Sequence, residues 1–258
     1  MTDLPRVAAL ASRASSPKKY LWTAGGEQFA AAWFGTGADR MPFPLRFTSR
    51  FESIREYRAY QRKVRAVLER PDNEPIRRAV RALAESEWRI ELFGYDNRRA
   101  GAEIRAVGGT AGRDAVVAIQ DAETGAVRLR RCPATALSTE LVALLPDRPP
   151  GSVPERAFLL DDLAAGREEQ SGVRPHRERA EDYRRFWNQP HQTRGAVTVL
   201  PARVPRPRRV TAARWLDATD GRYLETLANR ALMIRPAGPG EMARHLAGVM
   251  ARLAADRP

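Results

Sequence analysis

The chain has 258 residues, of which 43% are apolar and 29% are charged, and its formal net charge is +13. These proportions are typical of a water-soluble globular protein, and no apolar run approaches the roughly 20 residues that a membrane helix needs. A single cysteine, Cys132, excludes an intrachain disulfide and favours a reducing compartment. The positive charge attracts polyanions and acidic protein partners.

The N-terminal part of the sequence predicts helices that precede a sheet. Residues 1–19 lack the pattern of a cleavable secretion signal, and we expect a flexible tail there. Residues 20–34, "YLWTAGGEQFAAAWF", indicate a short strand running into a helix. Apolar residues at helical spacing predict a second helix from Ser53 to Pro71, and a third that opens at Pro75.

After the third helix the apolar period changes from 3.6 to 2, which is typical of strands. Four strands are predicted in this part of the chain, at residues 87–95, 102–109, 115–120 and 126–131. Because the links between them are short, consecutive strands must pair antiparallel. Pro133 then opens a helix that carries Leu137, Leu141, Leu144 and Leu145.

A proline-rich interruption at 146–154 divides the chain, and the second part has the same order of elements. An amphipathic helix at 178–189 precedes strands at 195–201, 209–217 and 222–236, and a final helix covers 241–255. The sequence therefore predicts an α+β fold: a central antiparallel β-sheet with flanking helices, in two pseudo-twofold-related halves. Residues 20–150 and 151–258 would be the halves of one integrated globular domain.

Two similar acidic segments, "DAETG" at 121–125 and "DATDG" at 217–221, fall between alternating apolar runs. They are either carboxylate-bearing sites or hairpin turns. Glycine supplies a positive φ and aspartate bonds its own turn backbone, so the pattern favours turns.

The search for catalytic chemistry finds no convincing group. The three histidines, His176, His191 and His245, lack the spacing of a zinc site, and Cys132 is isolated. The glycine-rich segment 107–116 lacks the lysine of a phosphate-binding loop and leads into a strand. We therefore predict a binding protein that is not an enzyme and needs neither a cofactor nor a metal.

The most basic run is "RVPRPRR" at 203–209, an extended cationic segment that could follow a phosphate backbone. No aromatic residue interleaves it for base stacking, and no zinc finger, helix-turn-helix or RNA-recognition motif accompanies it. Nucleic-acid binding by the arginine-rich surface is the alternative hypothesis.

The ordered motifs resemble those of the EspG family of type VII (ESX) secretion chaperones. The segment "VVAIQDAETGAVRLRRCPATALSTELVALLPDRPPGSVPERAFLLDDLAA" is similar to the central signature of that family. The C-terminal "PRPRRVTAARWLDATDGRYL" resembles its arginine- and proline-rich loop, aromatic strand and Asp-Gly-Arg-Tyr hairpin. The similarity extends from about Tyr20 to Leu253.

The resemblance implies a cytosolic actinobacterial chaperone that binds the hydrophobic tip of a helical PPE-like protein in a PE–PPE pair. Such a chaperone keeps its client soluble and targets it for export. In the family the client contacts come from the loop between the first two long strands and from the C-terminal helices. Those positions correspond here to Arg98 and Arg99, predicted as polar selectivity contacts, and to Tyr183, Phe186 and Trp187, predicted as anchors. Packing of these aromatic residues into the core is the alternative.

Overall fold

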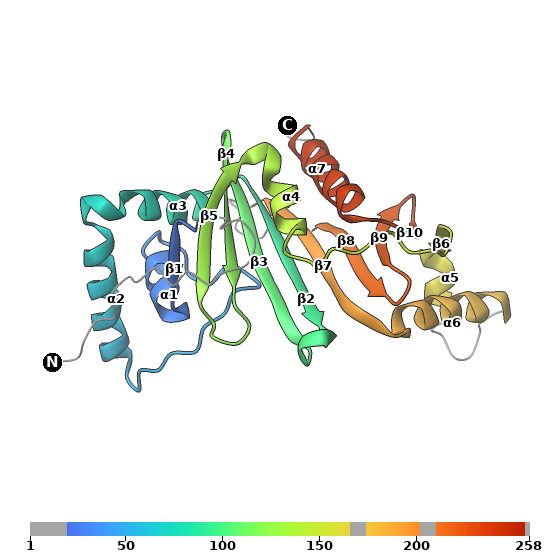
Figure 1. The fold of residues 1–258 in the computed structure, drawn as a ribbon, viewed down its shortest axis with the longest axis horizontal. Helices are drawn as coiled ribbons and strands as arrows, with labels where there is room; N and C mark the ends of the chain where they lie inside the picture. Colours follow the sequence, from blue (N-terminus) through green and yellow to red (C-terminus); the bar gives the residue numbers. More distant parts are fainter. Residues whose placement is uncertain (1–19, 166–173, 202–209, 256–258) are drawn as a thin grey trace.

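The computed structural model describes residues 20–165, 174–201 and 210–255. Within these residues, ten strands form one antiparallel sheet that runs the length of the molecule (Figure 1). The strand order is β1-β5-β4-β3-β2-β7-β8-β9-β10-β6. The antiparallel pairing expected from the short links is confirmed.

Most strands agree with the sequence pattern to within a few residues at each end, but the single strand expected at 222–236 is wrong: a turn at Asn229 and Arg230, both with positive φ, divides it into two paired strands. The strands are β1 (Trp22–Ala24), β2 (Trp88–Asp96), β3 (Ala102–Ala111), β4 (Asp114–Gln120), β5 (Val127–Pro133), β6 (Arg156–Leu159), β7 (His191–Pro201), β8 (Val210–Ala218), β9 (Arg222–Ala228) and β10 (Ala231–Pro236). The short strand β6 was not predicted from the sequence. It pairs with β10 and forms one edge of the sheet.

The helices lie at the two ends of the sheet and across its middle (Figure 1). They are α1 (Gly26–Phe34), α2 (Ile54–Leu68), α3 (Glu74–Ala84), α4 (Leu137–Val142), α5 (Leu160–Ala165), α6 (Arg174–Asn188) and α7 (Pro239–Ala255), with short 3-10 turns η1 (Pro71–Asn73), η2 (Asn97–Arg99) and η3 (Ala134–Ala136). Ser53 is the N-cap of helix α2, since its hydroxyl accepts a hydrogen bond from the Glu56 amide at 3.2 Å.

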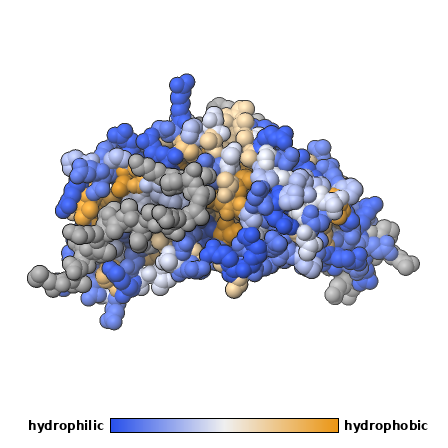
Figure 2. Space-filling view, in the orientation of Figure 1, coloured by the Kyte–Doolittle hydropathy of each residue, from blue (hydrophilic) through white to orange (hydrophobic). Residues whose placement is uncertain are grey.

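Alternation along the strands gives each face of the sheet its own core. One face carries the largest cluster, with Ile90, Leu92 and Trp215 packed beneath α4 and α7. The other face carries one cluster with Phe29 and Trp33 of α1 and another with Phe158 and Phe186. Figure 2 shows that the face turned to the viewer is mainly hydrophilic, with apolar residues near its middle and toward its left end.

The two acidic segments lie at hairpins, but their aspartates differ. Asp121 caps its own turn by accepting from the Thr124 amide at 2.9 Å, and Gly125 has a φ of +68°. In the second hairpin the Asp220 carboxylate accepts from the Ser152 amide at 2.9 Å, which ties the turn to the proline-rich interruption. Asp217 is buried in the sheet.

One predicted helix differs from the structure, and two predictions concern residues that the structure does not describe. The helix expected after Pro133 is shorter than predicted, because α4 ends at Val142 and Leu144 and Leu145 follow it. The predicted tail at 1–19 and the basic run at 203–209 lie outside the described residues. In the part of the chain that is described, no helix is long and apolar enough to cross a membrane.

Candidate functional site

The five predicted contact residues belong to two elements at the same end of the strands. Arg98 and Arg99 lie in η2, which joins β2 to β3, and the three aromatic residues lie on α6, which leads into β7. Figure 1 shows the β2–β3 hairpin and α6 along one side of the molecule. A hydrogen bond from the Asn97 side chain to the His191 carbonyl, at 3.2 Å, connects the hairpin to the start of β7.

The hairpin is rigid around Asp96. This carboxylate is only 6% exposed and accepts from the Arg98 side chain at 2.9 and 2.7 Å and from the Arg98 amide at 3.0 Å. The hydrogen bond from Arg98 holds the pKa of Asp96 below its usual range. Ala100 and Gly101, with φ values of 51° and 76°, complete the turn. Arg98 is therefore half-exposed but held in one direction.

Arg99 has a looser attachment. Its guanidinium lies 2.7 Å from the Glu123 carboxylate in the β4–β5 turn, and both side chains are exposed. Exposed ion pairs of this kind contribute about 0–1 kcal/mol to stability. Arg99 can therefore exchange Glu123 for an acidic group of a partner at little cost.

Helix α6 is attached to the sheet through one buried carboxylate, Glu225 of β9. It accepts from the Tyr183 hydroxyl at 2.7 Å and from the Trp187 indole at 2.9 Å. Arg214 of β8 lies 3.0 Å from the same carboxylate, and its guanidinium stacks 3.8 Å from the centre of the Trp187 ring. Burial, reinforced by Glu225, raises the pKa of Tyr183 to about 12.

The other aromatic contacts of α6 are apolar. The Phe186 ring meets the Tyr223 ring edge-on at 5.2 Å, and Tyr183 meets Phe158 at 5.3 Å. Phe186 and Trp187 are each 8% exposed, whereas Tyr183 is half-buried. In the free protein, then, these residues belong largely to the core cluster beneath α6. Their role as client anchors stays a prediction.

An exposed aromatic group near the hairpin was not predicted. Tyr95 is 40% exposed and Phe43 is 42% exposed, and both pack edge-on against Phe93, with ring centres 5.2 and 5.4 Å apart. The signal was present in β2, where Phe93 and Tyr95 alternate with the core residue Leu92. A strand with apolar residues on both faces needs cover on both, and here the second face is only partly covered.

The described residues offer little for catalysis. No cluster of histidine, cysteine and acidic side chains among them could hold a metal ion. All three histidines are hydrogen-bonded within the fold: His245 lies 2.8 Å from the Ala212 carbonyl oxygen, His176 lies 2.8 Å from Asp162, and His191 lies 2.8 Å from the Gln189 carbonyl oxygen. The arrangement of charged groups beside partly exposed rings is suited to binding another protein.

The family model described as the EspG family matches residues 26–248, which is most of the chain. The chain belongs to the EspG family. Membership in this chaperone family confirms the resemblance seen in the sequence and the prediction that the chain is not an enzyme.

No curated protein sequence matches this EspG-family chain significantly. Among solved structures it is similar to the Mycobacterium tuberculosis type VII secretion system chaperone EspG5, determined in complex with a PE25–PPE41 dimer. The TM-score is 0.61 at 15% sequence identity, and the match covers 89% of this chain and 95% of that chain. At this identity the likeness shows the fold, and it confirms the predicted α+β architecture.

Proposed function

We propose that this EspG-family protein is a cytosolic specificity chaperone of type VII secretion. It would bind the hydrophobic tip of a helical PE–PPE-like client, keep the client soluble and direct it to export. The observation that carries this proposal is the family match over residues 26–248, supported by a fold shared with EspG5 over nearly its whole length. EspG5 was solved with a bound PE25–PPE41 dimer.

The surface between the β2–β3 hairpin and α6 is the proposed client site. Arg98 and Arg99 would supply polar contacts at its rim, because both reach solvent and Arg99 is held only by an exposed pair. Tyr95 and its neighbouring rings would supply apolar area. Aromatic and arginine side chains of this kind dominate binding energies at protein interfaces.

The proposed site would be supported by three aromatic residues that pack under α6: Tyr183, Phe186 and Trp187. Because Phe186 and Trp187 are almost fully buried, they would fix the position of α6 and touch the client only at their exposed edges. The exposed part of Arg214, stacked on Trp187, extends the same surface. The client's apolar tip would then rest on a preorganised helix.

We also propose the pseudo-twofold arrangement of the two halves, with residues 20–150 and 151–258 forming one integrated domain. The strand order supports it, since β2 and β7 are central neighbours and each half continues outward from them. In each half a short early strand forms the edge, β1 beside β5 and β6 beside β10. A helix follows the last long strand of each half, α4 and α7, and these two helices contact each other.

Co-expression with PE–PPE-like pairs from the same genome tests the proposed function. We expect a stable complex that elutes as one species in size-exclusion chromatography, with a mass measured by light scattering. Failure of every such pair to form a complex with the folded chaperone would contradict the proposal.

A matched pair of variants tests the site. Arg99→Ala should weaken the complex about 3–10-fold, as expected for the loss of one polar contact of about 1 kcal/mol. Arg113→Ala removes another exposed arginine, from the β3–β4 turn at the opposite end of β3, and should leave the affinity unchanged. Equal effects of the two substitutions would place the client elsewhere.

A further inference from the structure

Helix α2 presents a stripe of basic side chains to solvent at the end of the molecule farthest from α6 (Figure 1). Arg55, Arg58 and Arg62 are all exposed and follow the i, i+3, i+7 spacing that aligns residues on one face of a helix. At 1.5 Å of rise per residue they cover about 10 Å. Lys63 of the same helix and Arg70, which lies just beyond the end of α2, are also exposed. We call these five side chains the α2 stripe.

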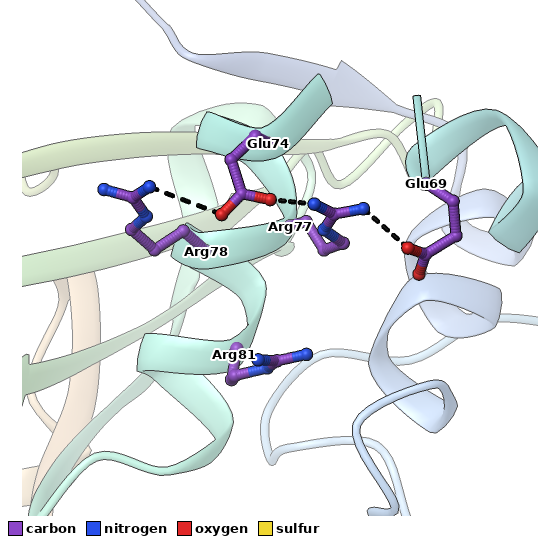
Figure 3. Close-up of a pocket in the computed structure, with 5 residues that line it drawn as sticks. All are labelled: Glu69, Glu74, Arg77, Arg78 and Arg81. Atoms are coloured by element: carbon purple, nitrogen blue, oxygen red, sulfur yellow. Dashed lines mark hydrogen bonds and ion pairs between the residues drawn. The ribbon is translucent and has the colours of Figure 1, made fainter. Parts of the chain in front are cut away.

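The α2 stripe has no acidic counterpart within the described residues: none of its members takes part in an ion pair there. Two carboxylates near the end of α2 are already engaged. Glu69 lies 2.6 Å from Arg77, and Glu74 contacts both Arg77 and Arg78 (Figure 3).

Helix α3 carries a further exposed basic side chain. Arg81 lines the same pocket as the Glu69–Arg77–Glu74–Arg78 chain of ion pairs (Figure 3). Among the described residues it joins none of these pairs, and its side chain is exposed. Arg81 is thus an exposed cation on α3, in a pocket whose acidic groups already have partners.

The like charges of the α2 stripe destabilise helix α2. Arg55 and Arg58 are three residues apart and Arg58 and Arg62 are four apart, and like charges at these spacings repel one another. Glu56, the only acidic residue within α2, lies in the first turn beside the Ser53 cap. An anionic partner laid along the stripe would relieve this repulsion.

We propose that the α2 stripe binds an acidic segment of a second protein partner, distinct from the secretion client. Arginine forks pair with carboxylates through two parallel hydrogen bonds, so a row of three guanidinium groups fits a row of aspartate or glutamate side chains. This inference is independent of the proposed function, because the hairpin and α6 lie away from α2 (Figure 1).

Other anionic partners fit less well. The aromatic residues of α2 pack inward, Tyr57 against Phe47 at 5.9 Å and Tyr60 against Phe51 at 5.1 Å, so they are not free to stack on nucleic-acid bases. Only Ile54 exposes a large apolar side chain on this helix, which is too little for insertion into a membrane surface.

The test compares two triple variants of the full chain. R55Q/R58Q/R62Q removes three charges from the stripe, and glutamine keeps the helix propensity of arginine. R40Q/R113Q/R252Q removes the same charge from exposed arginines scattered over the surface. The affinity of each variant for a 20-residue glutamate peptide is measured at 0.15 M salt, where electrostatic interactions are screened over about 8 Å. Unfolding curves verify that each variant is folded.

We expect the stripe variant to bind the peptide at least 10-fold more weakly and the scattered variant to lose less than twofold. Equal losses would show that net charge alone attracts the peptide, and would overturn the proposal. So would a stripe that binds duplex DNA or anionic phospholipid vesicles but not the peptide. Loss of the PE–PPE-like complex in the stripe variant alone would overturn the assignment to a second partner. Failure of both variants to bind any client would contradict the proposed function and leave the result of the peptide experiment unchanged.

Discussion

Arg222 and Asp217 form a completely buried ion pair. The guanidinium donates to both carboxylate oxygens, at 2.6 and 2.9 Å, and neither side chain has any exposed surface. Arg222 also donates to the Pro146 carbonyl at 2.8 Å, and Asp217 accepts from the Thr193 hydroxyl at 2.6 Å. The pair therefore joins β7, β8 and β9 to the proline-rich connection between the two parts of the chain.

Removing one partner of this pair should be strongly destabilising. Arg222→Ala leaves Asp217 buried without a countercharge, and we expect a loss of about 3–5 kcal/mol in the free energy of unfolding. Urea denaturation followed by tryptophan fluorescence measures it. The exposed pair Arg230–Asp161 provides the control, since Arg230→Ala should cost less than about 1 kcal/mol. Similar midpoints for the two variants would contradict this assessment.

Position 195 must be a glycine because the ring of Trp215 packs directly against its backbone. A Cβ placed at this glycine would lie 2.2 Å from the Trp215 side chain and 2.3 Å from the Phe93 carbonyl oxygen. Because the backbone cannot move away easily, Gly195→Ala should destabilise the sheet by about 1–3 kcal/mol or more. Gly25→Ala is the matched substitution, because no atom lies within 4 Å of the added Cβ. Its melting temperature should stay within about 2 °C of the wild-type value, and a similar value for Gly195→Ala would argue against the close contact.

Glu225 should control the attachment of α6. Glu225→Ala removes the acceptor of Tyr183 and Trp187 and leaves both donors buried, at an expected total cost of about 2–4 kcal/mol. In hydrogen–deuterium exchange, Glu225→Ala should exchange faster than the wild type in α6, whereas the exchange of α1 should not change. Thr226→Ala changes the next residue, whose side chain points to the opposite face of β9, and should leave α6 protected. Unaltered protection of α6 in Glu225→Ala would show that its apolar contacts suffice.

The raised pKa of Tyr183 predicts a loss of stability at high pH. Since the folded state holds the hydroxyl neutral up to a pKa of about 12, against 10.0 for the free side chain, its contribution is complete below pH 10 and is lost between pH 10 and 12. The free energy of unfolding should therefore fall more steeply in this range for the wild type than for Tyr183→Phe. Parallel curves for the two proteins would contradict the assignment.

The sequence was sufficient for the order and type of most elements. Proline positions and the change of apolar period after α3 are local signals, and the structure follows them closely. It also placed the hairpin turns, because Asp121 and Gly125 use short-range geometry. The family resemblance added the function class, which no local pattern contained.

Only the tertiary structure decided what the individual side chains do. Asp217 and Asp220 stand in the same acidic motif, yet one is paired inside the sheet and the other caps a connection 68 residues away. Tyr95 and Phe93 remain partly exposed while Phe186 and Trp187 are buried, although all four lie in amphipathic segments. Periodicity identifies the faces of an element, but which face is covered depends on elements that are distant in the chain. That information arises only when the chain packs.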